Sequence, residues 1–240
     1  MKKSIITALL AIVAMTAAAQ QQTSTTIFST ERSTAEITYG IEGGVTFSTL
    51  TGDLDLNHRT GFNIGAVVNI PVLESLYIKS GIRFIQKGAK YDEYHFEDYE
   101  DFDFKSNAAY IEIPILASYR YNFDSSNQLQ INVGPYLAFG VGGKTKIENT
   151  DNTDNHYDYY EGWEFDTFGD HGLLKRFDLG FQFGIGMTLA SQYYVGLGYE
   201  LGLINIANDD FFDYAASEGY DLGDVSIKNG SWFINVGYTF

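Results

Sequence analysis

The sequence predicts an all-β protein: an eight-stranded antiparallel up-and-down transmembrane β-barrel with short periplasmic turns and long extracellular loops. Three observations favour this fold class. Eight segments alternate between apolar residues and small or polar ones, as strands do when their two faces meet different surroundings. The connections between the segments alternate between short and long. The final segment, SWFINVGYTF, keeps one wholly apolar face to its last residue, which a terminus that frays into water rarely does.

The N-terminal residues have the features of a secretory signal peptide. Lys2 and Lys3 precede an apolar core from Ile5 to Met15, and three alanines follow as a small-residue cleavage motif. A membrane anchor is the alternative, but the apolar run is shorter than the roughly 20 residues that a spanning helix needs. The predicted organisation is a signal peptide at 1–19, a flexible periplasmic segment at 20–35 and a barrel domain at 36–240.

The composition limits the partners of the chain. Lys and Arg number 15 against 31 Asp and Glu, a formal net charge of −16, and a protein this acidic repels nucleic acid. There is no Cys, so disulfides do not contribute to stability. Aromatic residues make up 16% of the chain, in keeping with the aromatic girdles of outer-membrane barrels.

The first four predicted strands each carry an apolar row opposite a row of small, polar or charged residues. A proline after the second strand indicates a tight turn, and the segment YDEYHFEDYEDFDFK after the third is too acidic to lie in lipid. The apolar rows are Tyr39, Ile41, Val45 and Phe47 in 36–48; Phe62, Ile64, Ala66, Val68 and Ile70 in 60–70; Leu76, Ile78, Ile82 and Phe84 in 75–88; and Ile111, Ile113, Ile115, Tyr119 and Tyr121 in 108–122.

The last four predicted strands repeat the pattern, and glycines dominate the opposite row of the sixth and seventh. With an even number of strands, both ends of the barrel return to one side of the membrane, the periplasm, where outer-membrane barrels have their short turns. The apolar rows are Leu129, Ile131, Val133, Leu137, Phe139 and Val141 in 129–143; Phe177, Leu179, Phe181, Phe183, Ile185, Met187 and Leu189 in 176–189; Tyr193, Val195, Leu197, Tyr199, Leu201 and Leu203 in 193–204; and Trp232, Ile234, Val236, Tyr238 and Phe240 in the closing strand.

The apolar rows are expected to face lipid. A soluble, lipocalin-like barrel with the apolar rows inside is the alternative. The interior of an eight-stranded barrel is only wide enough for its own side chains, and rows of Phe and Leu from every strand would overpack it. The opposite rows, rich in Gly, Asn, Gln and Tyr, fit a packed polar interior better than a solvated surface.

Charges of both signs fall on the inner rows, and buried charges must be paired. Glu112 and Arg83 lie on adjacent strands, so we expect them to form the centre of a salt-bridged plug. A selectivity filter in a narrow pore is the functional alternative, although a lumen of eight strands leaves little room for water. The predicted network is Glu42, Lys79, Arg83, Glu112, Arg120, Asp178 and Glu200.

The sequence shows no catalytic or cofactor motif. The four histidines, His58, His95, His156 and His171, fall in predicted long loops without a partnering serine motif or metal-ligand spacing. The acidic residues of two long loops are candidate calcium ligands. Neither run has the ordered spacing of a calcium-binding loop, so a solvated acidic surface is favoured. We therefore expect a non-enzymatic protein without a cofactor or metal.

Aromatic side chains interleave with the loop acids. Such loops can hold a protein or glycan partner through Tyr and Trp anchors. Extension of the strands beyond the membrane explains the alternation in DFDF equally well. The candidate partner-binding residues are Tyr94, Phe96, Tyr99, Tyr159, Tyr160 and Trp163.

Several segments resemble the outer-membrane β-barrel ("porin family", PorT-like) proteins of Bacteroidetes: GIEGGVTFS, LYIKSGIRFIQKGAKY, YIEIPILASYRY, INVGPYLAFGVGGK and RFDLGFQFGIGM. The resemblance covers nearly all of the chain after the signal peptide. It implies an OmpA/OmpX-type eight-stranded barrel in the cell outer membrane, and it implies neither pore activity nor catalytic residues. One branch of this family serves type IX secretion.

Two classes of function remain open: a structural or interaction protein, and a narrow small-solute channel. The expected partners are outer-membrane lipids and the outer-membrane assembly machinery, with a monomeric barrel. The resemblance implies that the machinery reads the terminal aromatic strand, through Trp232, Tyr238 and Phe240.

Overall fold

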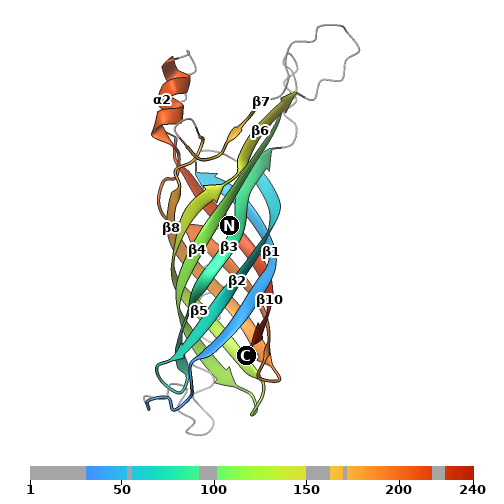
Figure 1. Cartoon of the computed structure of the whole chain (residues 1–240), viewed down its shortest axis with the longest axis vertical. Helices are drawn as coiled ribbons and strands as arrows, with labels where there is room; N and C mark the ends of the chain where they lie inside the picture. Colours follow the sequence, from blue (N-terminus) through green and yellow to red (C-terminus); the bar gives the residue numbers. More distant parts are fainter. Residues whose placement is uncertain (1–30, 53–55, 92–101, 150–162, 170–171, 218–224) are drawn as a thin grey trace, which may run out of the picture. The chain divides into compact units, whose positions relative to one another are not determined.

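The computed structural model describes residues 31–52, 56–91, 102–149, 163–169, 172–217 and 225–240. Residues 32–240 form one compact unit, whose body is a closed antiparallel β-barrel (Figure 1). The strands of its wall are β1 (Thr38–Gly52), β2 (Asn57–Pro71), β3 (Leu76–Tyr91), β4 (Phe102–Asn122), β5 (Gln128–Gly142), β8 (Phe177–Leu189), β9 (Tyr193–Gly202) and β10 (Ile227–Thr239).

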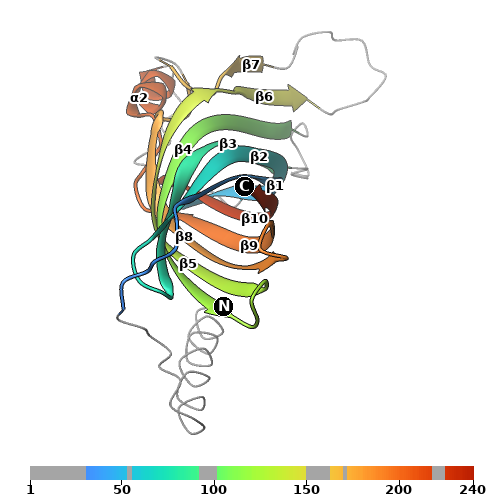
Figure 2. The same ribbon diagram turned by 60° about the horizontal axis from the view of Figure 1, so that its bottom comes forward.

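Each wall strand pairs with the next wall strand in sequence, including β3 with β4. The first and last strands close the ring: β1 pairs with β10 from Gly40 opposite Thr239 to Gly52 opposite Ile227. The strands follow one another around the wall in Figure 2. Every strand therefore has two partners, so the barrel wall has no free edge. The predicted eight-stranded antiparallel barrel is confirmed.

The connections divide the barrel into two ends. Residues 72–75, 123–127 and 190–192 make tight connections at what we call the short-turn end. Here Arg32 forms an isolated bridge with Leu73, and the amide of Phe240 donates to the carbonyl of Tyr39 at 2.8 Å. The other connections lie at the opposite end, which we call the long-loop end. They are longer, except that β1 and β2 are joined by only residues 53–56, where a long loop was predicted.

Two strands at the long-loop end were not predicted. β6 (Lys144–Asn149) continues β5 past a kink, and β7 (Trp163–Asp166) pairs with β6. Gly143 makes the kink with a φ of 146°, where an added Cβ would lie 1.9 Å from the carbonyl oxygen of Asn107. β4 begins at 102 rather than at the predicted 108, because its first residues, 102–106, pair with β6. The alternation in DFDF thus belongs to an extended strand as far as it is described.

A helix and a histidine also differ from the expectation. α2 (Asp209–Ser217) lies in the connection between β9 and β10, where only a loop was predicted. Its first turn carries two acids, which suit the positive end of the helix dipole. His58 was predicted in a loop but lies in β2, exposed and opposite Ala89. No helix among the described residues is both long and apolar enough to cross a membrane.

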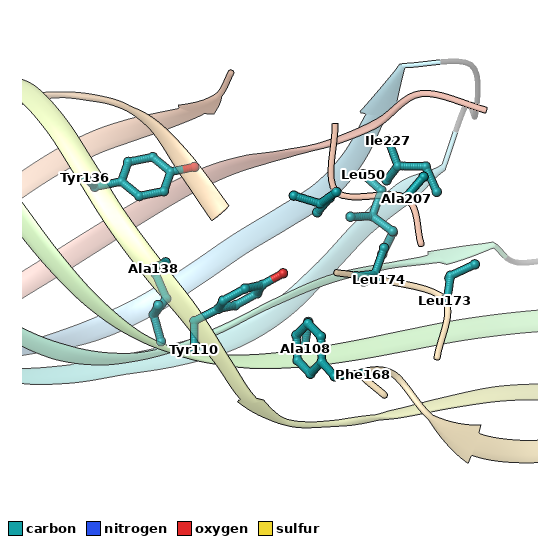
Figure 3. Packing of buried hydrophobic residues seen from close by; sticks show 13 residues of the cluster. Leu50, Ala108, Tyr110, Tyr136, Ala138, Phe168, Leu173, Leu174, Ala207 and Ile227 are labelled. Carbon is teal, nitrogen blue, oxygen red and sulfur yellow. The ribbon is translucent and has the colours of Figure 1, made fainter. Parts of the chain in front are cut away.

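The two faces of the wall match their prediction. Residues of the apolar rows dominate the exposed large hydrophobics, from Tyr39 in β1 to Val236 in β10. The alternate positions are buried and mostly polar. The interior of the barrel therefore holds the polar side chains, and most of its buried apolar residues form one cluster (Figure 3).

Candidate functional site

Five charged side chains meet in the upper half of the lumen, near the long-loop end. The ammonium of Lys87 lies 3.0 Å from Glu112 Oε2, 2.9 Å from Glu200 Oε2 and 3.6 Å from Asp178 Oδ2. The guanidinium of Arg83 bridges the other oxygens of the same two glutamates. We call these five residues the central cluster.

The barrel topology explains why these charges converge. Arg83 lies directly opposite Glu112 in the β3–β4 register, whereas Asp178 in β8 and Glu200 in β9 project from another part of the wall. The ion pairs therefore cross the lumen instead of running along one pair of strands. Lys87 and the three carboxylates are fully buried, and Arg83 is only 8% exposed.

Neutral groups complete the central cluster. Asp178 accepts hydrogen bonds from the amide of Asn229 at 2.8 Å and the hydroxyl of Tyr136 at 3.2 Å. Arg83 donates to Gln182 at 3.2 Å, and the ammonium of Lys87 lies 4.2 Å from the centroid of the Tyr136 ring. Buried ions are tolerated when paired and hydrogen-bonded in this way. Two cations face three carboxylates, so the central cluster carries an excess of one negative charge.

A second ion pair lies lower in the lumen. Lys79 donates to Glu42 at 2.5 Å, and its ammonium lies 4.0 Å from the centroid of the Tyr194 ring. A cavity of about 30 Å³ is lined by residues of both layers, including Arg83 and Lys79. This volume suffices for about two water molecules.

Arg120 stands apart from both groups, towards the short-turn end. Its guanidinium donates to Asn69 Oδ1 at 2.6 Å and lies 3.8 Å from the centroid of the Tyr77 ring. Of the seven residues predicted for the network, the structure thus places four in the central cluster, two in the lower pair, and Arg120 in neither.

Lys87 is the residue that the sequence reasoning missed. It lies on the inner row of β3, four positions after Arg83, so the same alternation that selected Arg83 also marks it. With Lys87 included, the predicted network holds four cations and four carboxylates. The two signs of charge are therefore equal in number among these eight residues.

An apolar layer of buried residues lies at the long-loop end (Figure 3). It meets the central cluster through Tyr110 and Tyr136, whose ring centroids lie 5.6 Å and 4.2 Å from the Lys87 ammonium. The connection between β7 and β8 contributes Phe168 and Leu174, and the segment after β9 contributes Ala207. Leu174 forms bridges with both Phe168 and Ala207, and the Phe168 ring packs edge-on against Tyr110 at 5.3 Å. The remaining buried members are Leu50, Ile85, Ala89, Ala108, Tyr136, Ala138, Leu173, Ile206 and Ile227. We call this layer the apolar cap.

Of the six residues predicted to bind a partner through the loops, only Trp163 falls within the described residues. Tyr94, Phe96, Tyr99, Tyr159 and Tyr160 lie outside the described residues, as do His95, His156 and His171. The backbone of Trp163 begins β7, but its side chain is not described. Within the described part of the chain, no group of three or more His, Cys, Asp or Glu is arranged to hold a metal ion.

The three predicted assembly residues lie on the outer face of β10 and just after it. Trp232 packs against Tyr199 with ring centroids 4.8 Å apart, while Tyr238 contacts the rings of both Tyr193 and Phe240. Phe240 is 73% exposed. These contacts show where the aromatic residues lie and leave their role in assembly a prediction.

A model of the outer membrane protein β-barrel domain family matches residues 18–208 of this chain. Similar solved structures include the attachment invasion locus protein Ail of Yersinia pestis, at 15% identity over 86% of this chain and 100% of that one, with a TM-score of 0.38. Neisserial surface protein A has 11% identity over 86% and 100%, with a TM-score of 0.40. OprG of Pseudomonas aeruginosa has 12% identity over 88% and 97%, with a TM-score of 0.39. Likenesses of this size carry no argument about function. No curated protein matches the chain.

Proposed function

Because the chain belongs to the outer membrane protein β-barrel domain family, we propose that it is a monomeric, non-enzymatic barrel with a plugged lumen, which acts as a structural or interaction protein through its long-loop end. The observation that carries this proposal is the succession of layers in the lumen. The apolar cap lies over the central cluster, and the Lys79–Glu42 pair follows below.

Each layer opposes passage of a solute for a different physical reason. The aliphatic and Phe side chains of the apolar cap offer no hydrogen bonds to a hydrated ion. In the central cluster, moving one member out of place would leave its buried partners unpaired, which costs several kcal/mol per ion. Solute flow through this lumen therefore requires two unfavourable rearrangements in series.

The outer face suits a bilayer. At about 3.4 Å per residue and a tilt of about 40°, a 13-residue strand such as β8 spans about 30 Å along the barrel axis. That length equals the hydrocarbon thickness of about 30 Å. The outward residues of β8, among them Phe183 and Ile185, are about half exposed, so they would contact lipid.

We assign the short-turn end to the periplasm, since outer-membrane barrels have short periplasmic turns and longer external loops. The test uses single cysteines, which the chain allows because it has none of its own. Ser125→Cys probes the short-turn end and Lys144→Cys the long-loop end. A membrane-impermeant maleimide applied to intact cells should label Lys144→Cys alone. Labelling of Ser125→Cys in intact cells would reverse the assignment.

The partner of the long-loop end is proposed to be an extracellular protein or glycan. In the described part of this end, the Phe165 ring of β7 stacks on Phe211 of α2 with centroids 5.7 Å apart. The exposed pairs of Lys144 with Glu164 and Asp166 lie on the same hairpin. Stacked rings and exposed charges give a preformed polar and aromatic platform of the kind that holds a partner. Membership of the PorT-like branch stays a prediction from the segments quoted above.

Solute flux tests the plugged lumen. Proteoliposomes holding the folded barrel should swell in arabinose no faster than liposomes holding no protein. Heat-modifiable gel mobility establishes that the inserted protein is folded. Swelling that slows as the sugar grows larger would contradict the proposal and favour a narrow channel. That alternative is kept because the lower lumen also contains a second, larger cavity.

A further inference from the structure

The second cavity opens among the turn residues of the short-turn end. Its volume is about 160 Å³, and every residue that lines it has a polar side chain. The inner walls are formed by Asn69, Arg120, Gln130 and Thr188, and the rim by the 124–128 turn, Ser191 and Thr239. We call it the turn pocket.

Arg120 has no carboxylate partner among the described residues. Lys79 pairs with Glu42, whereas Arg83 and Lys87 share the acids of the central cluster. Arg120 is only 9% exposed, and its Nε has no hydrogen-bond partner. A buried guanidinium that meets only an amide oxygen and a ring face keeps capacity to bind an anion.

The acid on the rim of the turn pocket does not compensate Arg120. Asp124 is occupied within its own turn, where its carboxylate accepts bonds from the amides of Ser126 and Asn127 and from the Asn127 side chain, all at 2.8 Å. Other lining groups have donors to offer. Thr188 Oγ1 accepts from Gln130 at 2.7 Å, which leaves its hydroxyl hydrogen free to donate to a ligand.

We propose that the turn pocket is a binding site for a small oxyanion, a phosphate or a carboxylate, with Arg120 as its charged anchor and Thr188 as a second donor. An Arg fork matches both groups, and charge-assisted hydrogen bonds are the stronger kind. A cavity of about 150 Å³ accommodates a ligand of about six non-hydrogen atoms. The pocket therefore fits inorganic phosphate, acetate or the phosphate of a lipid headgroup. This site does not depend on whether the lumen is closed above it.

The experiment titrates the barrel, refolded in phosphate-free detergent micelles, with sodium phosphate and separately with sodium acetate. The side-chain amide signals of Asn69 and Gln130 in NMR spectra report occupancy. We expect saturable shifts with at least one anion. Arg120→Gln should weaken binding at least tenfold, and Thr188→Val several-fold. The control Lys144→Gln, which removes an exposed cation of β6, should leave the affinity unchanged.

A second arm identifies the source of the oxyanion. In phospholipid nanodiscs, signals already shifted before any phosphate is added would assign the site to a lipid headgroup, whereas unshifted signals that move on titration would assign it to a free anion. Linear, unsaturable shifts in micelles would overturn the proposal. So would equal affinity in the wild type and folded Arg120→Gln. If Arg120→Gln does not fold, Thr188→Val decides, and unchanged affinity in that variant overturns the assignment.

Discussion

The substitution Lys87→Met removes the cation that joins three buried carboxylates. Met is apolar and of similar length, so the change deletes the charge and leaves the volume nearly intact. Afterwards Arg83 alone must offset Glu112 and Glu200, and Asp178 loses its cation. Removing one member of a buried ion pair costs about 3–5 kcal/mol. We therefore expect the free energy of unfolding to fall by about that amount, which is a factor of at least 100 in the folding equilibrium.

The matched control is Lys144→Met. Lys144 also contacts two carboxylates, Glu164 at 3.5 Å and Asp166 at 3.2 Å, but both are exposed. Exposed pairs contribute about 0–1 kcal/mol, so this variant should unfold almost as the wild type does. The two substitutions delete the same atoms and differ only in burial.

The assay is urea unfolding of the barrel in lipid vesicles, followed by tryptophan fluorescence. A Trp163→Phe background leaves Trp232, on the outer face of β10, as the reporter. A loss below about 1 kcal/mol in Lys87→Met, equal to that of Lys144→Met, would refute the reasoning. A double variant adds a second check: Lys87→Met with Glu200→Gln should lose less than the sum of the single losses, because the two side chains are in contact.

Three further predictions concern the seam, the wall and a turn. Phe240→Ala should refold in vitro within twofold of the wild-type yield, since the ring is mostly exposed. If the assembly machinery reads the terminal aromatic residue, the level of this variant at the surface of cells should fall at least fivefold. Equal modest losses in both assays would refute recognition by the machinery. Gly44→Ala should destabilise the barrel by about 1–3 kcal/mol, because the new Cβ would lie 1.8 Å from a backbone oxygen of β10. In the control Gly142→Ala the new Cβ meets no atom within 4 Å, so this variant should be neutral in the same urea titration. Hydrogen bonds from Asn127 and the turn amides lower the pKa of Asp124, so its stabilisation of the turn is complete above the ordinary pKa and is lost as pH falls through the lowered one. The protection factors of the amides in this turn, which correct for the slower intrinsic exchange at low pH, should fall in acid, and Asp124→Asn should remove that pH dependence.

The wall strands and their two faces could be predicted because period-two alternation persists over ten or more residues in each of them. In β8 the apolar row alternates with four Gly or Gln residues on the opposite face, so the sequence shows clearly which face meets lipid. The pairing of Arg83 with Glu112 also followed from adjacency of two strands. Contacts across the lumen, such as Lys87 with Glu200, depend on the stagger of the closed barrel. No local pattern encodes that stagger.

The long-loop end was the least predictable part. β6 has only six residues and follows the glycine kink, so its alternation is too short to stand out from a loop. α2 has nine residues and lies in an acidic, loop-like stretch. The apolar cap depends on Phe168 and Leu174, which belong to no periodic row and become buried only because their connection folds into the barrel mouth. Sequence periodicity cannot reveal apolar residues of that kind.

Single-channel recording in planar bilayers tests the closed lumen most directly. The purified, folded barrel should insert without producing conductance steps, because the apolar cap and the central cluster occupy the lumen. Arg83→Gln and Glu112→Gln should lower the free energy of unfolding without opening the lumen. Under conditions in which these variants stay folded, they too should show no conductance steps. Steady, salt-dependent steps in the wild type, with a size that changes in either variant, would contradict the account.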